Sequence, residues 1–226
     1  PAIRMRALQK IPVITEYTHD SIFVGEDGPT HQPVEHLMAA RTIPDLLVLR
    51  PCDANEAVVA SRLAFEQLEF PSLVLLTRQG LPVLDRDLYP SPEEFRKGAY
   101  ILSDYNKGSQ DISIFASGSE VSLALDIKEE LRNDFNIRVV NFGCWELFDK
   151  QSEDYKTSII YDSSFKVSIE AGITDGWQKY TGNKGLNIGI NRFGESAPGK
   201  EVAESLGLSI SSIKEKIISA YSKSVL

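Results

Sequence analysis

Short apolar runs that alternate with helix-like stretches are the feature that most limits the fold of this 226-residue chain. In the first part of the chain, three runs of apolar or β-branched residues are bounded by Pro, Asp or Gly: Val13 to Tyr17, Leu46 to Leu49 and Leu73 to Thr77. A strand that is buried on both faces of a parallel sheet is apolar along its length. The alternation therefore predicts an α/β fold with two open, largely parallel sheets flanked by helices.

The second part of the chain continues this pattern. Its strand candidates are Ile112 to Ala116, Ile137 to Phe142, Lys166 to Glu170 and Leu186 to Ile190. The clearest helix candidates of the whole chain are Asp53 to Leu68, Glu120 to Leu131 and Ile210 to Tyr221. Asp53 and Glu56 have the spacing of a capping box, which predicts where the first of these helices begins. Its apolar face is expected to consist of Ala54, Ala57, Val58, Phe65 and Leu68.

A segment rich in proline and charged residues divides the chain. Residues 81–98 contain three prolines and four acidic side chains, a composition typical of a linker between domains. We therefore expect one domain at 1–80 and a second at 99–226. Three strand candidates precede the linker, fewer than an open sheet usually has, so the first sheet is expected to be incomplete.

Composition argues against nucleic-acid binding, a membrane span and a structural zinc site. The net charge of −8 does not supply the basic face that nucleic acid requires. The apolar runs are too short to span a membrane. Cys52 and Cys144 are too few and too far apart for a structural zinc site, which predicts two reduced thiols in a cytoplasmic protein.

The loop from Tyr17 to Glu35 has the highest density of titratable groups, with two histidines and four carboxylates. It follows the carboxyl end of a predicted strand, where open α/β sheets bind ligands. A polar surface loop is one explanation of this composition. A metal site is disfavoured because Gly28 and Pro29 interrupt any helix that would align its ligands. The candidate ligands would be His19, Asp27, His31, Glu35 and His36. A triad of His19, Asp20 and Ser21 is excluded because adjacent side chains of an extended chain point to opposite sides.

A site for a sugar phosphate accounts for these residue types better than a metal site or a catalytic triad does. Arg78 follows another predicted strand, and its guanidinium can bind a phosphate as a planar fork, with a histidine such as His19 as a second donor. A carboxylate such as Asp27 can accept a hydrogen bond from a sugar hydroxyl. A second histidine, His31, can transfer protons near neutral pH.

The sequence resembles the transketolase family over essentially its whole length. The resemblance rests on the run from Tyr17 to Glu35 and on four further segments: Arg50-Pro51-Cys52-Asp53, Thr77-Arg78-Gln79, Ala116-Ser117-Gly118-Ser119-Glu120 and Phe193-Gly194-Glu195-Ser196-Ala197-Pro198. The related deoxyxylulose-phosphate synthases keep an Asp-Gly-x-Thr-His core but lack the Thr-His-Asp-Ser-Ile lead and the Phe-Gly-Glu-Ser-Ala-Pro segment.

The resemblance implies a homodimeric enzyme of the pentose phosphate pathway. With thiamine diphosphate and a divalent cation, Mg or Ca, such an enzyme moves a two-carbon ketol unit from a ketose phosphate to an aldose phosphate. Carried over by position, His19 and Arg78 would bind the phosphate of these phosphorylated sugars. Asp27 would bind the hydroxyl next to the acceptor carbonyl, and His31 would be the catalytic residue at the reacting carbons.

The chain also departs from the family pattern. It has no Gly-Asp-Gly diphosphate motif, and the glutamate that contacts the pyrimidine ring of the cofactor is expected upstream of Pro1. The chain is therefore expected to be a carboxyl-terminal piece that binds neither cofactor nor cation alone, is inactive alone, and has the missing amino-terminal part as a partner. The alternatives are a non-catalytic assembly module, a deoxyxylulose-phosphate-synthase-like enzyme, and one subunit of a split enzyme.

Two glycine-containing segments have simple structural explanations. Ser117 and Glu120 have capping-box spacing, which predicts a helix start without a bound phosphate. The segment from Gly194 to Pro198 is expected to be a turn at a domain or subunit contact.

Overall fold

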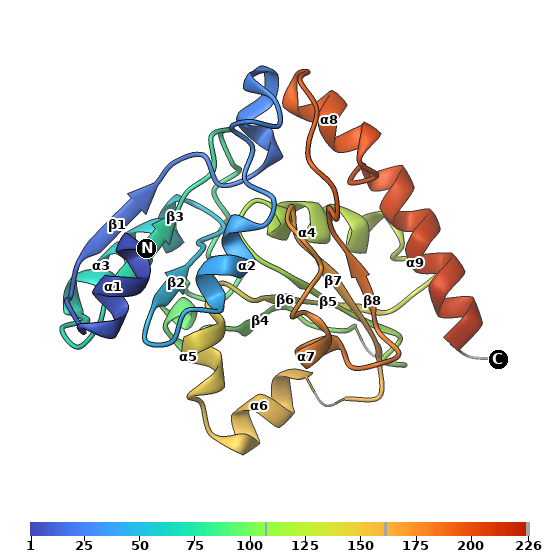
Figure 1. Cartoon of the computed structure of the whole chain (residues 1–226). Coiled ribbons are helices and arrows are strands. Elements are labelled where there is room, and N and C mark those ends of the chain that lie inside the picture. Colours follow the sequence, from blue (N-terminus) through green and yellow to red (C-terminus); the bar gives the residue numbers. More distant parts are fainter. Residues whose placement is uncertain (107, 161, 225–226) are drawn as a thin grey trace.

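The computed structural model describes residues 1–106, 108–160 and 162–224, and its helices surround two β-sheets (Figure 1). The elements around the first sheet are α1 (Ala2–Leu8), β1 (Ile14–Tyr17), η1 (Ile22–Asp27), α2 (His36–Arg41), β2 (Leu47–Leu49), α3 (Ala54–Glu66) and β3 (Ser72–Leu75). Those that follow are η2 (Pro92–Lys97), β4 (Tyr100–Ser103), β5 (Ile112–Ala116), α4 (Glu120–Glu130), β6 (Ile137–Asn141), α5 (Trp145–Asp149), α6 (Glu153–Ile160), β7 (Phe165–Ile169), α7 (Gln178–Thr181), β8 (Leu186–Ile188), α8 (Gly199–Ser205) and α9 (Ile210–Ser224).

The first sheet is parallel and has the strand order β1-β3-β2. Ser72 of β3 pairs with Ile14 on one side and with Leu47 on the other. Strands β2 and β3 are buried throughout, as their apolar sequences require. Strand β1 pairs with β3 alone within the described residues, and its Ile14 and Tyr17 are exposed.

The second sheet has the order β4-β6-β5-β7-β8, and all pairs are parallel except β4 with β6. The predicted α/β class with two largely parallel sheets is therefore confirmed. Strand β4 was not predicted, although Tyr100, Ile101 and Leu102 form a short apolar run; its four residues alternate between buried and half-buried positions. Such alternation is typical of an antiparallel edge strand.

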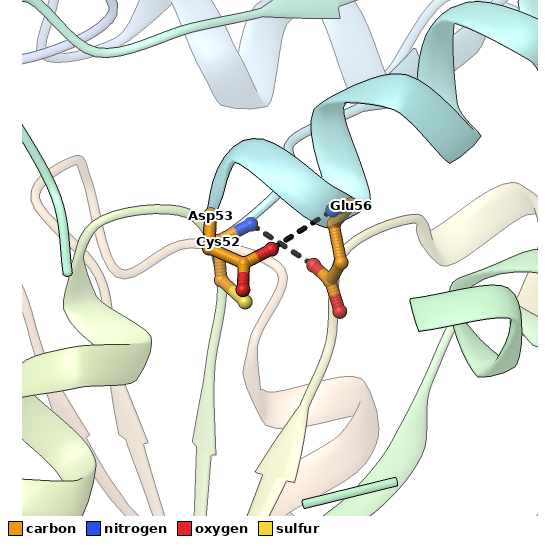
Figure 2. A group of neighbouring side chains, drawn as sticks. All are labelled: Cys52, Asp53 and Glu56. Atoms are coloured by element: carbon orange, nitrogen blue, oxygen red, sulfur yellow. Dashed lines mark hydrogen bonds between the residues drawn. The ribbon is translucent and has the colours of Figure 1, made fainter. Parts of the chain in front are cut away.

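Helix α3 begins where the capping box predicts, but the prediction of its buried face is wrong. The Asp53 carboxylate accepts a hydrogen bond from the backbone N–H of Glu56 at 2.8 Å, as Figure 2 shows. Phe65 is 74% exposed, and Val58 and Leu68 are exposed too. The buried residues of the helix are Glu56, Val59, Ala60 and Ala64. Small side chains on the buried face allow the helix to approach the sheet closely. Close packing therefore determined which face is buried, and the total hydrophobicity of the predicted face did not.

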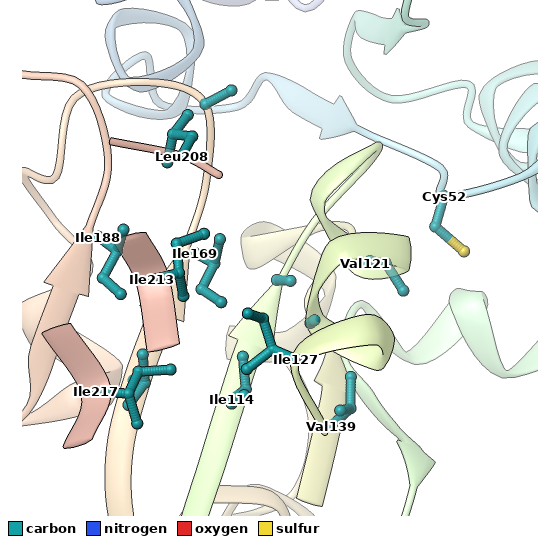
Figure 3. Packing of buried hydrophobic residues seen from close by; sticks show 14 of the residues in the cluster. Cys52, Ile114, Val121, Ile127, Val139, Ile169, Ile188, Leu208, Ile213 and Ile217 are labelled. Atoms are coloured by element: carbon teal, nitrogen blue, oxygen red, sulfur yellow. The ribbon is translucent and has the colours of Figure 1, made fainter. Parts of the chain in front are cut away.

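A shared apolar core joins the two parts of the chain. Helices α4 and α9 pack on the second sheet through isoleucines such as Ile127 and Ile213 (Figure 3). Ile22, Val34 and Cys52, which precede the linker in sequence, belong to the same cluster. Within the described ranges, none of the helices combines the length and apolar character needed to cross a membrane.

Residues 81–98, the expected linker, run along α3. Phe95 in this segment is buried. Two ion pairs connect the segment to exposed positions of α3, Arg62 with Glu93 at 3.0 Å and Arg96 with Glu66 at 2.7 Å. The segment therefore packs against the first part of the chain as it leads to the second.

Arg50 carries a buried charge that connects the two parts. Its guanidinium is fully buried and donates to Asp20 at 2.7 Å, before the linker, and to Glu120 at 2.6 Å, after it. The same group donates to the carbonyl and hydroxyl oxygens of Ser117. A Cβ on Gly118 would lie 2.7 Å from Cζ of Arg50, so only glycine leaves room for the guanidinium.

The predicted capping box of Ser117 and Glu120 is wrong. Helix α4 is preceded by Ser119, whose side chain makes no capping hydrogen bond. Glu120 is turned inward, where it binds Arg50 and accepts the backbone N–H of Ala171 at 3.0 Å. A buried cation is a stronger partner for this carboxylate than the backbone N–H groups at the start of a helix.

Glu170 extends this network. It forms a two-bond ion pair with Arg41, at 2.8 and 2.9 Å, and accepts the indole N–H of Trp177 at 2.9 Å. Burial opposes the ionisation of Glu170, but the charges of Arg41 and Arg50 outweigh this effect and lower its pKa. Five charged side chains from both parts of the chain are thus buried together.

The substitution Arg50→Met tests this network. It removes the charge and leaves buried carboxylates without a partner, so we expect the free energy of unfolding to fall by about 3–5 kcal/mol. Denaturant titration measures this loss. The matched control is Arg62→Met in an exposed ion pair, for which we expect a loss of about 1 kcal/mol or less. If both variants lost the same small amount of unfolding free energy, the proposed stabilising role of Arg50 would be contradicted.

Candidate functional site

The carboxyl ends of the first sheet bring together residues that are distant in sequence. Tyr17 of β1 lies opposite Leu75 of β3 in parallel register. His19 follows β1 by two residues and Arg78 follows β3 by three, so both leave the same edge of neighbouring strands. Both side chains are exposed. Arg50, which follows β2, leaves the same edge but is turned into the interior.

In the loop after β1, exposed candidate residues alternate with buried neighbours. His19, Asp27 and His31 are exposed. Each is followed by a buried residue, namely Asp20, Gly28 or Gln32. The backbone folds through the short helix η1 and closes on itself, with the N–H of His31 donating to the carbonyl oxygen of Gly28 at 3.0 Å. The buried residues can therefore fix the loop while the candidate groups face solvent.

Each candidate histidine is paired with the threonine that precedes it. The hydroxyl of Thr18 lies 2.9 Å from Nδ1 of His19, and the hydroxyl of Thr30 lies 2.9 Å from Nδ1 of His31. These bonds leave Nε2 of each ring available for a ligand. The threonines were not among the predicted site residues, although the repeated Thr-His pair was a sequence signal that could have identified them.

An apolar cavity of about 340 Å³ lies beside His19. His19, Asp20 and His36 line part of it. The remaining lining residues come mainly from α1, α2, β1 and β3 and are largely apolar: Ile3, Tyr17, Pro33, Leu37, Ala39, Ala40, Ile43, Leu73 and Leu75. Such a surface suits apolar side chains and lacks the cations that a phosphate needs.

Cys52, Asp53 and Glu56 bring three possible metal ligands within 4.8 Å of one another among the described residues (Figure 2). Their oxygens are already used. Besides the helix cap, Asp53 accepts from Arg86 at 2.8 Å, and Glu56 accepts from Tyr100 at 2.5 Å. The amide of Asn141 and the backbone N–H of Cys52 also donate to Glu56. The cluster is thus a hydrogen-bonded part of the interior that needs no metal.

Both cysteine thiols are free and buried, which we expect to suppress their reactivity. Burial is the main cause that raises the pKa of Cys52 and of Cys144. Because the thiolate is the reactive form, we expect both thiols of the native chain at pH 8 to react at least ~10-fold more slowly than free cysteine. Labelling with a chromogenic disulfide reagent measures the rate, and the denatured chain is the control. Rapid labelling of the folded chain would contradict this expectation.

Comparisons with known proteins agree on one family. A model of the "Transketolase, pyrimidine binding domain" matches residues 1–83, and a model of the "Transketolase-like TK C-terminal domain" matches residues 98–209. The transketolase of Aquifex aeolicus is 47% identical over 220 residues, which are 96% of this chain and 32% of that protein.

The solved structures show the same relationship. A transketolase variant from Pichia stipitis superimposes with a TM-score of 0.90 at 39% identity, covering 98% of this chain and 32% of the other. A split-gene transketolase, described as an inactive β4 tetramer, has a TM-score of 0.74 at 22% identity, covering 96% of this chain and 68% of the other, and shows a similar fold. The chain spans about a third of the length of the Aquifex and Pichia proteins.

Proposed function

Because this chain belongs to the transketolase family, we propose that it is the carboxyl-terminal part of an enzyme that transfers a two-carbon ketol unit from a ketose phosphate to an aldose phosphate. The observation that carries the proposal is the exposure of His19 and Arg78 at one edge of two neighbouring parallel strands.

We propose that Arg78 and His19 bind the phosphate of the sugar. Neighbouring strands lie about 4.8 Å apart, so side chains that leave their carboxyl ends can reach one phosphate. The guanidinium supplies a planar pair of donors, and Nε2 of His19 supplies another. The hydroxyl of Thr18 at Nδ1 orients this ring.

Asp27 and His31 are proposed to act at the other end of the sugar. The exposed carboxylate of Asp27 accepts a hydrogen bond from the hydroxyl next to the acceptor carbonyl. His31 exchanges a proton with a substrate oxygen through Nε2, the ring nitrogen that Thr30 leaves free. Thr30 holds Nδ1 of this ring at 2.9 Å.

The cofactor implied by the family, thiamine diphosphate, supplies the carbon–carbon bond chemistry when bound. The described residues do not fit its diphosphate group. A diphosphate needs a divalent cation held by carboxylates that still have free oxygens. The acidic cluster at Asp53 and Glu56 is buried and saturated by internal donors. We therefore propose that the diphosphate and its cation, Mg or Ca, bind to the amino-terminal part of the enzyme.

The exposed edge of β1 and the apolar cavity are proposed to pack against that amino-terminal part. An unpaired strand edge offers backbone groups to a further strand, and an apolar cavity of about 340 Å³ accepts its side chains. The exposed Ile14 and Tyr17 lie along this edge. The existence of a split-gene transketolase supports two parts that associate. The complete enzyme is further proposed to be a homodimer, as the family resemblance implies.

The division into domains at 1–80 and 99–226, with a linker at 81–98, is likewise a proposal. It is supported by the two matched ranges, 1–83 and 98–209. The free thiols of Cys52 and Cys144 support a reducing compartment, and we propose the cytoplasm and the pentose phosphate pathway.

Replacement of Arg78 by alanine in the complete enzyme tests the phosphate site. Loss of charged hydrogen bonds is expected to raise KM for phosphorylated sugars by ~10–100-fold. KM for an unphosphorylated sugar should stay unchanged, because that substrate lacks the bound group. Arg62→Ala, a loss of an exposed arginine on α3, is the control. An unchanged KM for the phosphorylated sugars would favour a non-catalytic assembly module.

A titration of this chain alone with thiamine diphosphate and magnesium tests its incompleteness. We expect neither saturable cofactor binding by calorimetry nor ketol transfer, since the described residues leave the diphosphate without ligands. The complete enzyme serves as the positive control. Tight binding accompanied by turnover would show that the chain contains a whole catalytic site.

A further inference from the structure

The side-chain amide of Gln32 ties the loop to a distant segment. Gln32 is 3% exposed and directly follows His31. Its Nε2 donates to the carbonyl oxygen of Gly25 at 2.8 Å and to that of Glu195 at 2.9 Å. Both acceptors face the amide nitrogen, so the two N–H groups are used, while Oε1 is buried beside Gly194 without a hydrogen-bond partner among the described residues. One side chain therefore closes the loop and joins it to a segment 163 residues away.

Gly194 leaves the space that Gln32 occupies. A Cβ on this glycine would lie 1.6 Å from Oε1 of Gln32. Any larger residue at this position would push the amide away from its two acceptors. The family resemblance at the segment from Phe193 to Pro198 thus coincides with a close contact to the loop that carries the proposed site.

A second contact lies on the other side of Asp27. The hydroxyl of Ser196 donates to the carbonyl oxygen of Glu26. A Cβ on Gly28 would lie 3.0 Å from Cβ of Ser196, so the two backbones approach closely here. Helix α8, which follows this segment, packs against η1 (Figure 1). The residues before and after Asp27, and the residue after His31, are all held by residues 194–196, here called the clamp segment.

We propose that Gln32 is a positioning residue, which holds Asp27 and His31 in their working geometry by fastening their loop to the clamp segment. The second part of the chain thereby sets acceptor recognition, although it contributes none of the four proposed substrate-binding side chains. Arg78 and His19 are attached differently, through β3 and through the bond of Asp20 to Arg50. This inference rests on the proposed function, because it assigns the geometry of that same site.

The test uses Gln32→Glu in the complete enzyme. This substitution preserves the shape of the side chain but places a carboxylate against two carbonyl oxygens. The readout is the ratio of kcat/KM for an aldose phosphate acceptor to kcat/KM for its 2-deoxy analogue, which lacks the hydroxyl assigned to Asp27. A ratio is unaffected by the fraction of folded enzyme. We expect the ratio to fall ~10-fold or more, because a displacement of about 1 Å can cost 100-fold in rate.

Three further variants make the result decisive. Gln178→Glu makes the same charge change at an exposed position of helix α7 and should leave the ratio unchanged. Asp27→Ala shows how far the ratio falls when the carboxylate that is proposed to bind the acceptor hydroxyl is removed. Ser196→Ala removes one exposed hydroxyl, so it tests the clamp segment even where Gln32→Glu does not fold, and it should lower the ratio ~2–10-fold.

The outcomes separate the two proposals. A lowered ratio in the Gln32 and Ser196 variants, with normal behaviour of the Gln178 variant, supports positioning by the clamp segment. An unchanged ratio in the folded Gln32 variant, or in the Ser196 variant where the first does not fold, overturns the inference when Asp27→Ala lowers that ratio. If Asp27→Ala has no effect or the complete enzyme transfers no ketol unit, the proposed function fails and the inference fails with it.

Discussion

The buried guanidinium of Arg50 is the interaction on which the rest of the structure depends. A charge in the interior is stable only when partners of opposite sign surround it, and here Asp20 and Glu120 come from the two sides of the linker. Glu170 adds a third carboxylate and is itself balanced by Arg41. Loss of a partner would leave a buried charge unpaired. The two parts of the chain therefore cannot separate without a large cost in free energy.

This constraint reaches the candidate site through sequence neighbours. Asp20, bound to Arg50, immediately follows His19, and Gln32, bound to Glu195, immediately follows His31. The exposed residues of the loop have few contacts of their own, so their positions depend on these buried neighbours. A loop alone would not hold several groups in one geometry; here the second part of the chain provides the rigid support that an active site requires.

Local sequence patterns predicted where helices and strands form better than they predicted the environment of individual side chains. The apolar runs predicted seven strands, since a buried parallel strand is specified by its own residues. Strand β4 was missed, although Tyr100 to Leu102 form a short apolar run. The exposed Phe65 and the inward Glu120 were mispredicted because their environments are set by residues far along the chain. The candidate site residues were readable as chemical types, but Gln32 was not, because its partner Glu195 is distant in sequence.

Two surfaces of the first sheet differ in chemistry, and the difference bears on how a complete enzyme would be assembled. Toward the second sheet a buried network of ion pairs lies beside a shared apolar core, and separating the two parts would leave these charges without partners. Along β1 lie the exposed side chains of Ile14 and Tyr17, a strand edge that is open within the described residues, and an apolar cavity beside His19. Apolar surfaces and strand edges form contacts without matched charges, so another part of the protein can cover them after this part has folded. The edge proposed to bind phosphate would then lie between this part of the protein and the part that covers it, and interfaces of this kind are where proteins commonly place small-molecule sites.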